Sequence, residues 1–154
     1  MKGHIDDAIK TLKSALTQFS SPSPQQALIL NALGNYYQTI SEFELAQDAF
    51  DQALNNTQQF PDMYNEAQIR YTVGLMDVTL KDFDAAVVNM KLAASLREKF
   101  GYRRGEAEAL SVLGMSYYYA KRMPESFEVL QKALPQSQRS VTEIIYRILL
   151  HFWP

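Results

Sequence analysis

The sequence predicts an all-α protein built as a solenoid of antiparallel helix pairs, with about 8 helices. Three segments align without gaps and carry glycines 40 residues apart, at Gly34, Gly74 and Gly114. A second frame of apolar residues recurs in step with the first. No segment shows the strict alternation of a half-buried strand. Self-similarity at a fixed period of this length is typical of stacked repeat units that share one core.

The recurring glycine has a physical explanation. Three of the six glycines in the chain share this spacing, so chance is a poor account of it. A glycine inside a helix costs about 1 kcal/mol relative to alanine. We therefore expect a compensating close approach of the neighbouring helix, with Ala46, Ala86 or Ser126 opposite the glycine.

The second frame predicts one amphipathic helix in each copy, because its residues recur at offsets of three, four and seven. Its members are Phe43, Ala46, Phe50 and Ala53, then Phe83, Ala86, Met90 and Ala93, then Met123, Ser126, Leu130 and Ala133, with an earlier copy in Ile5, Ala8, Leu12 and Ala15.

Local signals set the expected helix ends. Ser23 before Pro24 predicts an N-cap, and Ser41 and Ser140 each begin a capping-box pattern. The stretch from Gly101 to Gly105 is interpreted as a C-cap and turn. We expect helices near residues 4–19, 24–39, 42–57, 62–79, 82–100, 104–120, 124–135 and 140–152.

These residues resemble the tetratricopeptide repeat, which places a large residue, Leu-Gly and Tyr in a first helix and Ala, Phe and Ala in a second. The middle copy departs from the pattern at Arg70 and Asp77, and the period is 40 instead of the usual 34. An extended 40-residue subtype of this kind is similar to repeats of bacterial sensory proteins and of some eukaryotic adaptors. The matching residues are Leu30, Leu33, Gly34, Tyr37, Ala46, Phe50 and Ala53, and Leu110, Leu113, Gly114, Tyr117, Ser126, Leu130 and Ala133.

The resemblance implies one domain over residues 1–154, folded as a right-handed superhelical solenoid. It would contain a half-repeat at 1–22, repeats at 23–61, 62–101 and 102–138, and a terminal helix at 139–154. The half-repeats favour a fragment of a longer protein, or a homodimer formed through the apolar C-terminal helix around Leu149 and Trp153. The alternative is that both ends are capping helices.

Composition argues against several classes of function. A net charge of −2 gives no general attraction to nucleic acid, and no apolar run approaches the ~20 residues of a membrane span. The chain has no cysteine, and neither His4 nor His151 has a second histidine at helical spacing. We therefore expect no enzyme activity, no metal and no cofactor. The expected location is the cytoplasm, or the periplasm if a signal peptide has been removed.

The family's first helices line a concave groove, which implies a protein–protein interaction scaffold that binds a peptide or protein segment. The alternative is a sensory or regulatory domain of a larger bacterial signalling protein. For Tyr71, Met115 and Tyr119, packing between repeats is the competing interpretation. The expected groove residues are Asn31, Asn35, Gln38, Gln68, Tyr71, Leu75, Val78, Ser111, Met115, Tyr118 and Tyr119.

The groove positions are uncharged, so the family's basic clamp for C-terminal carboxylates is not expected here. The nearest basic cluster is interpreted mainly as a solvated rim, with contact to an acidic partner as the alternative. Its members are Arg97, Lys99, Arg103 and Arg104, with Lys121 and Arg122.

Overall fold

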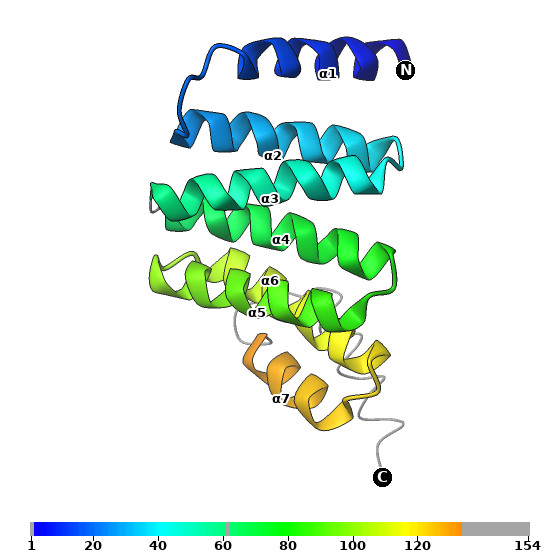
Figure 1. Ribbon diagram of the computed structural model, residues 1–154. Coiled ribbons are helices and arrows are strands. Elements are labelled where there is room, and N and C mark those ends of the chain that lie inside the picture. The colour runs from blue at the N-terminus through cyan, green and yellow to red at the C-terminus, as the bar shows by residue number, and fades with distance from the viewer. Residues whose placement is uncertain (1, 61, 134–154) are drawn as a thin grey trace. The chain divides into compact units, whose positions relative to one another are not determined.

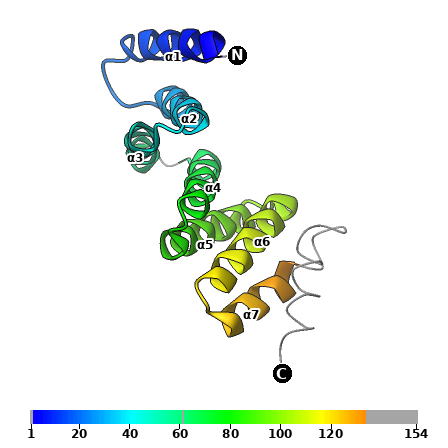
Figure 2. The ribbon, with the colours of Figure 1, turned by 90° about the vertical axis from the view of Figure 1, so that its right-hand side faces the viewer.

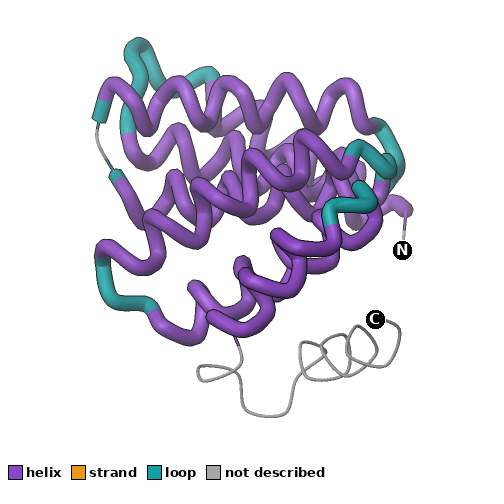
Figure 3. The backbone as a smooth tube through the Cα atoms, turned by 90° about the horizontal axis from the view of Figure 1, so that it is seen from below, coloured by secondary structure: helices purple, strands orange, loops and turns teal. Residues whose placement is uncertain are grey.

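A computed structural model describes residues 2–60 and 62–133, where helices are joined by short connections (Figure 3). The predicted bounds agree within two residues for α2 to α7, whereas α1 begins two residues earlier and ends three residues earlier than expected. The helix predicted at 140–152 lies outside the described residues. The helices are α1 (Lys2–Leu16), α2 (Pro24–Thr39), α3 (Phe43–Gln59), α4 (Met63–Thr79), α5 (Phe83–Lys99), α6 (Arg103–Tyr119) and α7 (Met123–Ala133).

The chain divides into two compact units, Met1–Ile69 and Arg70–Pro154, with the division inside α4. In the first unit α1 packs against α2 and α2 packs against α3 (Figure 1). In the second unit α5 packs against α6 and α6 against α7 (Figure 2). Short turns make these neighbours antiparallel. The predicted all-α class of antiparallel helix pairs is confirmed.

The second apolar frame forms the interior of the helix pairs. Phe50 and Ala53 of α3 are fully buried, and so are Met90 of α5 and Leu130 and Ala133 of α7. Burying a side chain of the size of leucine or phenylalanine contributes about 1.5–3 kcal/mol. This periodic apolar face is therefore what holds each helix against its neighbour.

The repeated glycines allow the close approach that the sequence predicts. A Cβ atom on Gly34 would lie 2.5 Å from Cε1 of Phe50. One on Gly114 would lie 2.5 Å from Cγ of Leu130. Such separations do not occur between real atoms, so the missing side chain is what admits the facing residue.

The expected partner of the glycine was wrong in two copies. The atoms nearest a Cβ on Gly74 belong to Met90 and Asn89, and those nearest Gly34 belong to Phe50. Longer side chains one turn away from Ala46 and Ala86 fill the space that the glycine leaves. In the last copy Ser126 does contact the glycine, since its hydroxyl donates to the carbonyl oxygen of Gly114 at 2.7 Å.

Each helix pair turns through a residue in the left-handed region. Ser41, Lys81 and Lys121 have φ values of 64°, 63° and 61°, and they recur at the 40-residue period. The backbone N–H of Glu42 donates to the Tyr37 carbonyl at 2.9 Å, and that of Ser41 donates to Gln38 at 3.0 Å. This pair of bonds is the Schellman arrangement that closes a helix C-terminus.

The same turn explains one wrong prediction about helix starts. Ser41 does not cap α3, because it ends the preceding helix in a left-handed conformation. Glu42 is the N-cap instead, and its side chain makes no capping bond. The cap at Ser23 is confirmed, with its hydroxyl accepting from the backbone N–H of Gln26 at 3.1 Å. The box at Ser140 lies outside the described residues.

Candidate binding surfaces

The predicted groove residues of the first unit lie on α2 and at the start of α4. Asn35 and Gln68 are exposed, whereas Asn31 and Gln38 are half-buried. The side-chain oxygen Oδ1 of Asn31 is itself buried and has no hydrogen-bond partner among the described residues. A buried acceptor without a donor costs about 1–3 kcal/mol. This row therefore combines exposed amides with one unsatisfied acceptor.

The predicted residues on the second unit's part of α4 are largely structural. Tyr71 and Leu75 pack against a buried cluster that includes Met90 and Leu113. Burial raises the pKa of the Tyr71 hydroxyl, with a further increase from Glu108. These contacts agree with the alternative interpretation of Tyr71 as a packing residue. Val78 is half-buried.

The α6 members of the row become more exposed toward the end of the helix. Ser111 is half-buried and its hydroxyl donates to the Ala107 carbonyl at 2.7 Å. Met115 is half-buried too. Tyr118 and Tyr119 are 39% and 52% exposed. They therefore offer the aromatic area, with polar tips, that is common at protein interfaces.

The two exposed tyrosines belong to a packed aromatic group. Tyr118 and Tyr119 meet edge to face, with ring centroids 5.4 Å apart. Tyr119 also stacks on Phe83, at the start of α5, with centroids 5.1 Å apart. Neighbouring rings hold the side chains in place, so a ligand that contacts them meets an ordered surface.

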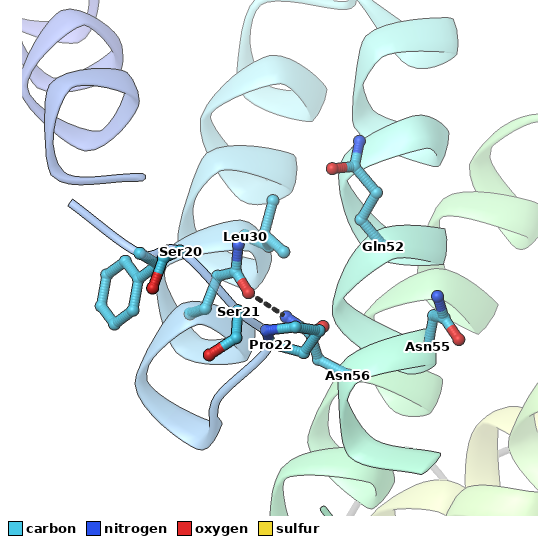
Figure 4. Close-up of a pocket in the computed structure, with 9 residues that line it drawn as sticks. Ser20, Ser21, Pro22, Leu30, Gln52, Asn55 and Asn56 are labelled. Atoms are coloured by element: carbon cyan, nitrogen blue, oxygen red, sulfur yellow. Dashed lines mark hydrogen bonds between the residues drawn. The ribbon is translucent and has the colours of Figure 1, made fainter. Parts of the chain in front are cut away.

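A pocket of about 240 Å³ lies in the first unit, between the α1–α2 connection and α3 (Figure 4). Asn56 is only 6% exposed, and its Nδ2 donates to Oε1 of Gln26 at 3.0 Å. Sequence reasoning missed this pocket because its residues come from three segments up to 37 positions apart. The lining residues are Phe19, Ser20, Ser21, Pro22, Gln26, Leu30, Gln52, Asn55 and Asn56.

Comparison with known proteins gives no matching family model and no matching curated protein. Solved structures do match. The N-terminal domain of stress-induced protein-1 from C. elegans has a TM-score of 0.73 at 15% identity, covering 85% of this chain and 99% of that one. The first tetratricopeptide domain of Spaghetti (RPAP3), bound to the HSP90 peptide SRMEEVD, has a TM-score of 0.69 at 19% identity, covering 86% and 97%. The chain has the tetratricopeptide-repeat fold.

A third structure, BtubC from P. vanneervenii, matches 99% of this chain with a TM-score of 0.80 and 18% identity. The chain spans 60% of the length of BtubC. Since all three identities lie below 20%, the likeness establishes the fold and not a shared ligand.

Within the tetratricopeptide fold, Arg97 is not the rim residue that the basic cluster suggests. It is only 3% exposed. Its guanidinium lies over the Tyr71 ring, 4.2 Å from the centroid, and its Nη1 donates to the Gly105 carbonyl at 2.7 Å. A planar cation between aromatic rings and a carbonyl is a structural element of the α5–α6 turn. Gly105 accordingly lies inside α6, not in the turn as expected.

The rest of the basic cluster is exposed, as a solvated rim would be. Arg104 pairs with Glu108 at 3.2 Å and Arg122 pairs with Glu125 at 2.9 Å. Pairs as exposed as these contribute little to stability. Lys99, Arg103 and Lys121 are also exposed.

The middle repeat carries a buried carboxyl at the position where the repeat pattern has tyrosine. Asp77 is 7% exposed and accepts a hydrogen bond of 2.8 Å from Nδ2 of Asn89. Nη1 of Arg70 donates to Oδ1 of Asn89 at 3.4 Å. Burial raises the pKa of Asp77, the bond from Asn89 opposes that effect, and nearby Asp82 adds to it.

Two findings concern other kinds of site. Among residues 2–60 and 62–133, no three histidine, cysteine, aspartate or glutamate side chains are grouped so that they could hold a metal ion. In the same part of the chain, none of the helices has the length and apolar character needed to cross a membrane.

Proposed function

We propose that this protein is an interaction scaffold whose first-helix side chains bind an extended peptide or protein segment. The binding residues form one row in each unit. Those of the first unit are Asn31, Asn35, Gln38 and Gln68, and those of the second are Tyr71, Leu75, Ser111, Met115, Tyr118 and Tyr119.

The unsatisfied oxygen of Asn31 is the observation that carries this proposal. A buried acceptor that lacks a donor is rare in folded proteins, and its cost is removed when a donor arrives. An extended peptide presents a backbone N–H at every residue except proline. Asn31 Oδ1 is buried and unpaired among the described residues. A bound peptide N–H would supply the missing bond.

The chemistry of the two rows also supports a largely uncharged ligand segment. None of the ten proposed residues carries a charge. The RPAP3 domain is bound to the peptide SRMEEVD, which contains three acidic side chains. Because desolvated carboxylates would meet no cation in the proposed rows, we expect this protein to bind that peptide much more weakly than an uncharged segment.

A peptide selection followed by titration tests the proposal. Peptides selected from a random displayed library against the wild-type chain would be measured by fluorescence anisotropy. Asn35→Ala and Tyr118→Ala remove exposed row residues, and each is expected to weaken binding about tenfold, a loss typical of one contributing interface residue. Asp48→Ala and Val88→Ala change exposed residues outside the rows and serve as matched controls. Unchanged affinity in both row variants would refute the proposed rows.

A second candidate is a sensory or regulatory domain of a larger bacterial signalling protein, acting on an attached output domain in the cytoplasm. The observation that favours it is the extended 40-residue period. The complete reading frame distinguishes the two candidates, because a regulatory domain requires an attached output domain. Homodimerisation through the C-terminal helix remains a separate proposal, which sedimentation of the chain at several concentrations would test.

A further inference from the structure

The pocket in the first unit coincides with a change in the repeat. Seven residues separate α1 from α2, whereas three separate α3 from α4 and three separate α5 from α6. The longer connection supplies Phe19, Ser20, Ser21 and Pro22 to one side of the pocket (Figure 4). The pocket is therefore formed by a segment that the other two connections do not have.

A second change falls on the opposite wall, which α3 provides. Gln52 and Asn56 of α3 correspond, one period later, to Leu92 and Leu96 of α5. Asn56 is 6% exposed, so an amide occupies an interior position where the next repeat has a leucine. A buried amide is costlier than a leucine in a helix interface. The fold alone does not account for it, and departures of this kind are expected at functional sites.

The lining specifies the chemistry of a ligand. Gln26, Gln52, Asn55 and Asn56 bring side-chain amides, and Ser20 and Ser21 bring hydroxyls. Each amide has both donors and an acceptor, and each hydroxyl can do either. No lining residue is charged, and Phe19 and Leu30 add apolar area. A neutral group with its own donors and acceptor fits this set, whereas a charged group would lose hydration without gaining a counter-ion.

We propose that this pocket is a second binding site, which takes the carboxamide side chain of an asparagine or glutamine in a partner protein. The pocket shares no residue with the two first-helix rows, so it can function whether or not those rows bind a peptide. The amides of Gln52 and Asn55, both exposed, make the first contact with the ligand. The existing bond between Asn56 and Gln26, 3.0 Å long, fixes the amides of the inner wall.

The test is a titration of the full-length ¹⁵N-labelled chain, followed in ¹H–¹⁵N spectra, with N-acetylasparagine methylamide. Its charged counterpart N-acetylaspartate methylamide and the sugar methyl glucoside are titrated in parallel. The asparagine probe should cause saturable shifts in the side-chain amides of Gln26, Gln52, Asn55 and Asn56. The aspartate probe should bind about tenfold more weakly or not at all, since its carboxylate finds no cation.

The variant imports the residues of the following repeat. Gln52→Leu combined with Asn55→Ser reproduces Leu92 and Ser95 at exposed positions, and it should abolish the shifts while the rest of the spectrum stays unchanged. Gln58→Leu makes the same chemical change on α3 outside the pocket and should bind like the wild type. Equal affinity for all three probes, a response to the glucoside alone, or undiminished binding by the double variant would each overturn the proposal.

Discussion

Alanine at Gly114 tests whether the repeated glycines exist to admit the facing helix. The new Cβ would lie 2.5 Å from Cγ and 2.6 Å from Cδ2 of Leu130, which is fully buried. Cγ is a branch point close to the backbone, so it cannot move aside without shifting α7. Overpacking of this kind costs about 1–3 kcal/mol, whereas alanine gains about 1 kcal/mol of helix propensity. We expect a net loss of roughly 1–2 kcal/mol.

Two other glycines provide the comparison. At Gly74 the nearest atom is the terminal methyl of Met90 at 2.8 Å, and a flexible methionine can withdraw it at little cost. Gly74→Ala should therefore be within about 1 kcal/mol of neutral. Gly3, in the first turn of α1, has nothing within 4 Å of its Cβ position. Gly3→Ala isolates the propensity gain and should be stabilising by up to about 1 kcal/mol.

The three variants and the wild type are compared by urea unfolding, followed through helical circular dichroism. The expected order of midpoints is Gly3→Ala, then wild type close to Gly74→Ala, then Gly114→Ala. The reasoning fails if Gly114→Ala is as stable as Gly74→Ala, because the contact distances would then have no energetic meaning.

Three further predictions concern buried or strained residues, all measured by the urea midpoint. Asp77→Asn should raise stability at pH 7: burial raises the folded-state pKa of Asp77, so the wild type loses stability as pH rises from about 4 through that pKa. The gain should vanish at lower pH, and a gain independent of pH would contradict this cause. Lys121→Gly should stabilise by about 0.5–1 kcal/mol, because φ is 61° there and only glycine adopts that region freely; a loss would count against it. Arg97→Lys should cost about 1.5–3 kcal/mol, since lysine cannot both stack on Tyr71 and bond the turn carbonyl; a neutral result would refute that role.

The helices were predictable from the sequence because each signal was local and repeated three times. The apolar frame around Phe50 and Leu130 recurs at helical spacing, and both residues are fully buried as that spacing requires. Ser23 was predictable as a cap because proline follows it at the first helical position. Ser41 was not, because two backbone patterns compete for the same residue. The Schellman closure of α2 prevailed there over a capping box for α3.

The candidate sites were less accessible to sequence reasoning. The position of Arg97 depends on Tyr71, 26 residues away, and on the helix that follows, so charge counting placed it wrongly on the surface. The pocket depends on a contact between Gln26 and Asn56, which no periodicity encodes. One signal was nevertheless present, because Asn56 stands where the next repeat has Leu96. Comparing polar residues with their apolar equivalents across copies would have pointed to it.

The left-handed turns at Ser41, Lys81 and Lys121 also bear on how such a chain can grow. Main-chain hydrogen bonds close each of these turns, so a serine and two lysines serve equally well there. A duplicated 40-residue segment would therefore bring with it a connection that needs no compensating change elsewhere. Lengthening by whole periods becomes a route open to single duplications, and an engineered array could use the same turn as its joint, with glycine in place of the lysine.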